Sequence, residues 1–165
     1  MSALLGIPQS VRDALTQYHN EWRHPRLPPL SVSGLYDLFP KEPTTFDVSY
    51  RWQPQETWPN ADRPGVYFVF DSDLGLLYVG QSSLLGRRLS HWFIGSAQCE
   101  RIQGTWKSNP RFVATVSVQR HFEALALEGF LIELFLPPEN TSLKRVAATL
   151  QDAQEVAGPT PPLNT

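Results

Sequence analysis

One carboxylate in this sequence stands where a charge is hard to accommodate. Glu128 lies in the segment ALEGFLIELF, in which nearly all the neighbouring side chains are apolar. Burying an ionised carboxylate without a partner costs several kcal/mol or forces it to take up a proton. Two partners are open from the residues alone: the guanidinium of Arg88, as a structural ion pair, or a divalent metal ion held with water molecules and a phosphate oxygen.

Two tyrosines bring hydroxyl groups into a second apolar stretch, residues 65–80, with the sequence GVYFVFDSDLGLLYVG. Its two apolar runs flank the turn-forming residues 71–75, which predicts a β-hairpin. Both alternating faces are apolar, so we expect the hairpin to be covered on both sides. Tyr67 and Tyr78 then place phenols in the core, and Gly65 and Gly80 stand where a Cβ would obstruct a close approach.

The elements around this hairpin predict a small α/β (α+β) fold. Ser83 is expected to cap a helix running from residue 84 to 93, and residues 111–119 alternate as a third strand. Residues 121–135 predict a helix buried on most sides, and residues 141–156 a last helix. The fold expected is a mixed or antiparallel three-stranded sheet flanked by helices.

The first 63 residues predict a helical and proline-rich extension. Ser10 and Asp13 resemble a capping box for a helix from Ser10 to Arg23, and eight prolines between Pro25 and Pro64 exclude further long helices. Residues 46–52 alternate as a strand. We expect residues 1–63 to pack on a domain at 64–157 as scaffold or to support a homodimer, with 158–165 as a flexible tail. The residues expected to face inward are Val11, Ala14, Leu15, Tyr18 and Trp22 in the helix, and Phe46, Val48, Tyr50 and Trp52 in the strand.

The pattern Gly-Val-Tyr, ten residues, then Tyr-Val-Gly resembles the hallmark of the GIY-YIG nuclease superfamily, with Val in both Ile positions. Arg88 follows Gly80 by eight residues, and Glu128 precedes Asn140 by twelve. This series is similar to the nuclease module of the bacterial excinuclease C subunit. The resemblance covers roughly residues 64–141.

The resemblance implies roles for five side chains in phosphodiester hydrolysis. Glu128 would hold a single Mg²⁺ or Mn²⁺, and Arg88 would contact the scissile phosphate as a planar fork. Tyr67 or Tyr78 would orient or deprotonate the attacking water, which requires nearby cations because the ordinary pKa of tyrosine is about 10. Asn140 would hold the site together through amide hydrogen bonds.

The sequence departs from the family pattern one helical turn after Arg88. Family members commonly carry His or Tyr four residues after this arginine, whereas Trp92 stands there and the histidine, His91, comes one residue early. One residue rotates a helical side chain by about 100°. His91 is therefore a further candidate catalytic residue whose direction the sequence does not determine.

Charge in this chain is local. The net charge of −2 excludes a constitutive basic coat for nucleic acid. A basic stretch does follow the hairpin, and it is either a solvated face or a contact surface for phosphates. The lone Cys99 excludes an intrachain disulfide and a zinc site built on several thiolates. The residues expected to bind nucleic acid are Arg87, Arg101, Lys107 and Arg111.

These features together predict a metal-dependent endonuclease that hydrolyses phosphodiester bonds in DNA. RNA is a second substrate class that the chemistry of the family does not exclude. The alternative is a catalytically inactive module of the same fold that binds nucleic acid or protein. No stretch of the sequence is long and apolar enough to cross a bilayer, and the N-terminus lacks a signal-peptide pattern, so a cytoplasmic location without membrane contact is expected.

Overall fold

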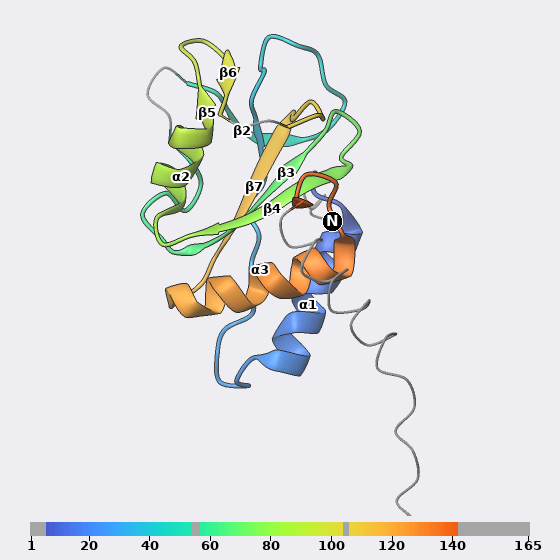
Figure 1. Cartoon of the computed structure of the whole chain (residues 1–165), viewed down its shortest axis with the longest axis vertical. Helices are drawn as coiled ribbons and strands as arrows, with labels where there is room; N and C mark the ends of the chain where they lie inside the picture. Colours follow the sequence, from blue (N-terminus) through green and yellow to red (C-terminus); the bar gives the residue numbers. More distant parts are fainter. Residues whose placement is uncertain (1–5, 54–56, 104–105, 142–165) are drawn as a thin grey trace, which may run out of the picture.

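The hairpin predicted from residues 65–80 lies inside a larger sheet (Figure 1). The structure is a computed structural model that describes residues 6–53, 57–103 and 106–141. Strands β3 (Gly65–Phe70) and β4 (Leu76–Ser82) form the hairpin. In its turn, Asp71 Oδ1 accepts hydrogen bonds from the backbone N–H groups of Asp73 and Gly75 at 2.9 and 2.7 Å. Every residue of β3 is buried, as the two apolar faces predicted.

Strand β7 (Phe112–Ser117) is the third predicted strand. It pairs antiparallel with β3, from Gly65 opposite Ser117 to Phe70 opposite Phe112. The α/β fold class is confirmed, and the three predicted strands are neighbours in a mostly antiparallel five-stranded sheet with the order β2-β1-β7-β3-β4. In this order β1, β7 and β3 each have neighbours on both sides, and β7 is the central strand.

The other two strands come from the N-terminal extension. Strand β1 (Leu35–Asp37) pairs antiparallel with β7, and β2 (Val48–Arg51) pairs parallel with β1. The alternating pattern at residues 46–52 therefore predicted a real strand. The prediction that Tyr50 faces inward is wrong, because this residue is 41% exposed. Strand β2 lies at the edge of the sheet and covers little of the core.

Among the described residues, helices cover both faces of this sheet (Figure 1). α1 (Gln9–Trp22) and α3 (His121–Phe135) pack on one face, and α2 (Leu85–Trp92) packs on the other. α3 has the bounds that the sequence predicted. A small two-stranded sheet, β5 (Phe93–Ile94) with β6 (Arg101–Ile102), follows α2.

Alternating residues of the central strands divide the core into two clusters. Val66, Phe68 and Phe70 of β3 point toward α1 and α3. Tyr67 and Val69 point the other way, toward α2. Period-two alternation thus explains why an entirely apolar strand was needed, because each face meets a separate apolar layer. The second cluster is rich in aromatic side chains: Tyr36, Trp52, Trp58, Tyr67 and Phe93.

Both predicted helix caps are wrong. α1 begins after Pro8 rather than Ser10, and no side chain caps it. α2 begins after Leu84, again without a side-chain cap. Ser82 rather than Ser83 is the structured serine, because its Oγ accepts a hydrogen bond from Leu84 N and donates one to Leu84 O. Before α2, the hydrogen bonds between Ser82 and Leu84 take the place of the cap expected from Ser83.

The expected burial of α3 on most sides is also wrong. Its inward face consists of Ala124, Leu127, Leu131 and Ile132. On the opposite side, Phe122 is 73% exposed, and Leu125 and Leu134 are exposed as well. Trp22, expected to face inward, is 69% exposed at the end of α1. Apolar composition alone could not separate the covered side of these helices from the open one.

The N-terminal extension packs on the rest of the protein, as expected for a scaffold. Ile7, Val11 and Leu15 share a core with β3, β7 and α3. Arg23 at the end of α1 donates a hydrogen bond to Glu123 of α3 and forms an ion pair with it. The described residues include no helix with the length and apolar character that crossing a membrane requires.

A fragment beginning at Asn60 should be much less stable than the whole chain. Removing β1 leaves β7 without one of its two neighbours, and removing α1 exposes the apolar surface of α3. We expect the Tm to fall by more than about 10 °C, if the fragment unfolds cooperatively at all. Circular dichroism melting of both proteins checks this. Equal Tm values would show that the first 59 residues are dispensable.

The helix expected at residues 141–156 and the tail at 158–165 lie outside the described residues, apart from Thr141. The boundary placed at residue 63 remains a prediction. The sheet itself crosses that boundary, because β1 and β2 precede it and β3, β4 and β7 follow it.

Candidate active site

The candidate residues gather at one edge of the sheet. β4 is the edge strand there, with α2 on one face and α3 on the other. Tyr67 and Tyr78 lie on the face of α2, which carries Arg88. Glu128 belongs to α3, which packs against β3 and β4 from the other side. Side chains from two separate layers can therefore meet only where the sheet ends.

The two tyrosines lie together across Gly80. Tyr67 is paired with Gly80 in the sheet, and its ring centroid lies 5.9 Å from that of Tyr78. A Cβ at position 80 would overlap the Tyr67 ring, including its hydroxyl, and the Tyr78 ring. Gly65 is equally constrained, since its Cβ would meet the carbonyl oxygen of Val116. The close approaches predicted at both glycines are confirmed.

Burial keeps both phenols protonated. Desolvation raises the pKa of Tyr67 well above its ordinary value, and the neighbouring Tyr78 raises it further, against a lowering effect of Arg88. The pKa of Tyr78 is raised mainly by burial and then by the charge of Glu128. A phenolate at either position therefore needs more positive charge than Arg88 supplies.

Glu128 is half-buried and makes one hydrogen bond to the backbone of β4. Burial raises the pKa of its carboxyl group, while the hydrogen bond from the Gln81 backbone N–H and the charge of Arg88 lower it. Arg88 is thus close enough to act on Glu128 and on both tyrosines. Among the described residues, however, Arg88 and Glu128 do not form an ion pair within 4.0 Å; the recorded pairs are Arg23–Glu123, Arg111–Asp37 and Arg111–Glu42.

Asn140 fastens the segment after α3 to the edge strand. Its Oδ1 accepts a hydrogen bond of 2.9 Å from Val79 N, and its Nδ2 donates one of 2.7 Å to Val79 O. The side chain is buried and continues the hydrogen bonding of β4 on the side where no strand follows. The amide contacts expected of Asn140 are therefore present, and they hold the strand between Tyr78 and Gly80.

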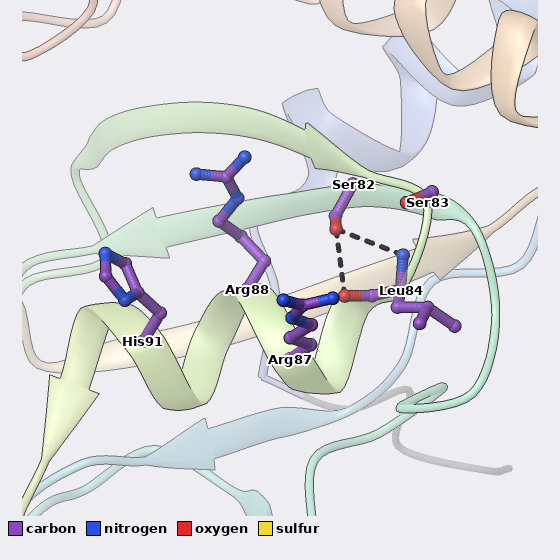
Figure 2. Close-up of a pocket in the computed structure, with 6 residues that line it drawn as sticks. All are labelled: Ser82, Ser83, Leu84, Arg87, Arg88 and His91. Atoms are coloured by element: carbon purple, nitrogen blue, oxygen red, sulfur yellow. Dashed lines mark hydrogen bonds between the residues drawn. The ribbon is translucent and has the colours of Figure 1, made fainter.

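The residues after Arg88 divide between core and surface. Trp92 packs against Tyr78, with ring centroids 6.1 Å apart, and against Trp106 at 5.3 Å. Trp106 in turn stacks on Tyr78 at 5.1 Å. His91 is exposed and lines a surface pocket with Arg88 (Figure 2). The departure from the family pattern therefore places an indole against the tyrosine and leaves the imidazole open to solvent.

The other predicted nucleic-acid contacts separate into two groups. Arg87, Arg101 and Lys107 are exposed. The prediction that Arg111 contacts nucleic acid is wrong, because the residue is only 6% exposed. Its guanidinium donates hydrogen bonds to Glu42 Oε2 at 2.6 Å and to Asp37 Oδ2 at 3.1 Å. A buried arginine pairs with carboxylates to offset the loss of hydration. Both carboxylates lie more than sixty residues earlier, so the basic stretch gave no sign of this pairing.

Sequence reasoning did not identify Gln81 or Trp106 as part of the site, and it did not predict where Trp92 packs. Gln81 supplies its backbone N–H to Glu128, and its side chain contacts His121 Nε2 at 2.6 Å. Trp92 and Trp106 shield one side of Tyr78. The first contact is made by the backbone, which no residue type reveals. The packing of the two indoles on Tyr78 requires a strand, a helix and a later segment of the chain to meet.

The residues present fit a metal ion that keeps most of its water. The described chain holds no group of three or more His, Cys, Asp and Glu side chains gathered for a metal. Glu128 is one half-buried carboxylate with no cation in direct contact, and burial destabilises its charge. Mg²⁺ characteristically binds through one or two carboxylates and retains several waters. A single carboxylate with this unmet charge suits such an ion.

The raised pKa of Glu128 predicts how stability depends on pH. Below the ordinary value of 4.5 the carboxyl is protonated in both states, and the folded protein retains its proton to higher pH. Between the ordinary pKa and the raised pKa, the unfolded protein has lost this proton while the folded protein still holds it. The free energy of unfolding should therefore fall as the pH rises through this range and level off above the raised pKa. Thermal melts between weakly acidic and neutral pH check this. Glu128→Gln should remove that part of the slope, and an unchanged slope would contradict the assignment.

Similarity to known proteins is concentrated in the region that holds these residues. Residues 63–141 match the family model described as the UvrC-like GIY-YIG domain. The chain is 39% identical over 84 residues to the UvrABC system protein C of Pseudomonas fluorescens, which covers 51% of this chain and 14% of that protein. The corresponding protein of Zymomonas mobilis is 38% identical over 82 residues, covering 50% of this chain and 12% of its own length. The chain thus spans only a small part of these relatives.

One solved structure is similar at 23% identity, with a TM-score of 0.36, over 50% of this chain and 87% of its own. It is the GIY-YIG N-terminal endonuclease domain of UvrC from Thermotoga maritima, a point mutant bound to its catalytic divalent cation. The family match extends from just before β3 to the residue after Asn140 and so includes Tyr67, Tyr78, Arg88 and Glu128. Residues 63–141 therefore match the UvrC-like GIY-YIG domain, in agreement with the superfamily that the hairpin motif predicted.

Proposed function

We propose that this protein is a divalent-metal-dependent endonuclease that hydrolyses phosphodiester bonds in DNA. The observation that carries the proposal is the meeting of Tyr67, Tyr78, Arg88 and Glu128 at the edge of the sheet. Arg88 acts on the pKa of each of the other three. Hydrolysis of a phosphodiester needs an activated water and positive charge at the crowded phosphate, and this cluster contains groups suited to both tasks.

Each side chain has a role that follows from its position. Arg88 presents a planar guanidinium to the phosphate oxygens and is free of a carboxylate partner within ion-pair distance in the described chain. The phenols orient the attacking water by hydrogen bonding, with Tyr78 the less buried of the two. Asn140 and Trp92 position Tyr78 from the strand and from α2.

Glu128 is the residue that would hold the metal ion. When bound, Mg²⁺ or Mn²⁺ would supply Lewis-acid stabilisation of the charge that develops on the phosphate. The carboxylate is suited to this because its backbone hydrogen bond to Gln81 fixes its direction. We further propose that the ion is Mg²⁺ or Mn²⁺, that the protein is cytoplasmic and that it can form a homodimer. RNA is a second substrate class for the same chemistry.

The direct test is cleavage by the whole chain. A panel of supercoiled plasmid, linear duplex, nicked, flap and single-stranded DNA is incubated with Mg²⁺, with Mn²⁺ and with EDTA. We expect cleavage of at least one DNA in the presence of a divalent ion and none with EDTA. A protein that binds these DNAs but cuts none of them with either ion would instead be the inactive binding module.

A further inference from the structure

A pocket of about 340 Å³ opens where β4 runs into α2 (Figure 2). Three of its residues are consecutive, from the last residue of β4 to the residue before α2, and three belong to the helix. In Figure 2, Arg88 extends from α2 toward the hairpin strands, and His91 lies one turn further along the helix. The six lining residues are Ser82, Ser83, Leu84, Arg87, Arg88 and His91.

The side chains of this pocket carry basic groups and no acidic one. Arg87, Arg88 and His91 are all exposed. In the described chain, none of the three takes part in an ion pair. Their donors are therefore available to an anion, and nothing in the lining of the pocket repels one.

Most of the backbone N–H groups at the start of α2 already have hydrogen-bond partners. Leu84 N donates to Ser82 Oγ at 3.1 Å, and Leu85 N to the carbonyl oxygen of Arg63 at 3.0 Å. Gly86 N donates to the carbonyl oxygen of Ala61 at 2.9 Å. Three of the N–H groups that a helix usually offers to an anion are thus occupied by the protein itself. The exposed basic side chains are therefore the main donors that the pocket offers to an anion.

Arg87 and His91 differ from Arg88 in what they act on. Arg88 lowers the pKa of Tyr67, Tyr78 and Glu128. Arg87 and His91 are not among the causes that shift these three pKa values. Residues four apart lie on the same side of a helix, so these two side chains form a pair. Arg88, one position from Arg87, borders both the pocket and the catalytic cluster.

We propose that Arg87 and His91 bind the phosphate adjacent to the scissile phosphate on the same nucleic-acid strand. This inference rests on the proposed function, because it takes Arg88 as the contact of the scissile phosphate. A strand whose phosphate reaches Arg88 must carry its next phosphate one nucleotide away. The pair Arg87 and His91 spans about 6 Å of helix, and the pocket between them and β4 is open to receive that group.

A flanking phosphate bound in this way would align the strand without taking part in the bond change. Its binding energy is present before and during the reaction, so it should appear in KM more than in kcat. The contact also ignores base identity, since phosphates carry no sequence information. If the pocket binds this flanking phosphate, the substrate must offer two consecutive phosphates on one strand.

The test measures binding without metal, so that it does not depend on cleavage. Fluorescence anisotropy of a labelled DNA duplex in EDTA gives the affinity of the whole chain over a range of salt concentrations. The double variant Arg87→Gln with His91→Gln should bind about tenfold more weakly at low salt. The slope of log K against log salt should become shallower by about 1.

The matched control removes the same two residue types elsewhere. His24→Gln with Arg26→Gln changes two exposed residues after α1, outside the pocket. We expect its slope to equal that of the wild type. An unchanged slope in the pocket variant, or an equal loss in the control, would overturn the proposal.

A second measurement tests whether the phosphate is the adjacent one. NMR titrations compare dTpT, with one phosphodiester, and dTpTpT, with two. The wild type should prefer the longer ligand by about tenfold, and the pocket variant should lose that preference. A variant that keeps the full preference would refute adjacency. A protein that behaves as expected here but never cleaves would retain this subsite and lose the nuclease assignment, and cleavage with an unchanged salt slope would do the reverse.

Discussion

Glu128→Gln should lower DNA cleavage by about a hundredfold or more while leaving the fold intact. The amide keeps the size of the side chain and an oxygen that can still accept the Gln81 N–H, but it removes the charge that would hold a metal ion. Because burial raises the pKa of Glu128, its ionised form weakens folding at neutral pH. The variant should therefore be as stable as the wild type or slightly more stable. Paired melting curves and plasmid cleavage measure both effects.

Glu133→Gln is the matched control for that change. Glu133 lies five residues further along α3 and is exposed. Its substitution should leave cleavage unchanged. If Glu128→Gln unfolded the protein and Glu133→Gln did not, Glu128 would be a structural residue and the metal assignment would fail. Equal losses of cleavage in both variants would show a general effect of surface charge.

Arg88→Lys should reduce kcat by more than about tenfold with little change in KM. Lysine keeps the positive charge but has no planar fork, so it cannot present two parallel N–H groups to the phosphate. It also brings a different charge distribution to Tyr67, Tyr78 and Glu128, whose pKa values Arg88 lowers. Steady-state kinetics on a cleaved oligonucleotide separate the two parameters.

Arg87→Lys provides the comparison, because Arg87 is the adjacent exposed arginine of the same helix. Its effect should fall mainly on KM, as expected of a group that binds a phosphate outside the reaction. If both substitutions lowered kcat equally, the catalytic arginine would be assigned to the wrong position or shared between the two.

Local pattern predicted the elements that meet the core. The hairpin at β3 and β4, the strand β7 and the bounds of α3 all follow from apolar periodicity and turn residues. The positions of Tyr67 and Glu128 along those elements, and of Asn140 after α3, followed from motif spacing. Their meeting at an edge strand did not, because it depends on the order of strands in the sheet.

Long-range partners account for the errors. Arg111 looked like a nucleic-acid contact until Asp37 and Glu42, far back in the chain, proved to surround it. β1 has only three residues and no readable alternation, and it exists because β7 offers it an edge. The apolar composition of α3 contained no signal to distinguish Leu127, which is covered, from Phe122, which is open.

The position of β7 in the sheet also sets the order in which the protein can assemble during synthesis. Strands β1 and β2 leave the ribosome before the hairpin of β3 and β4. The two pairs of strands are not hydrogen-bonded to each other in the sheet. Both wait for β7, which ends at Ser117 and lies between them. Until then each pair exposes an unpaired edge, the kind of surface that nascent chains aggregate through. Of the five strands of this sheet, the last to be translated is therefore the one that joins the two pairs into one sheet.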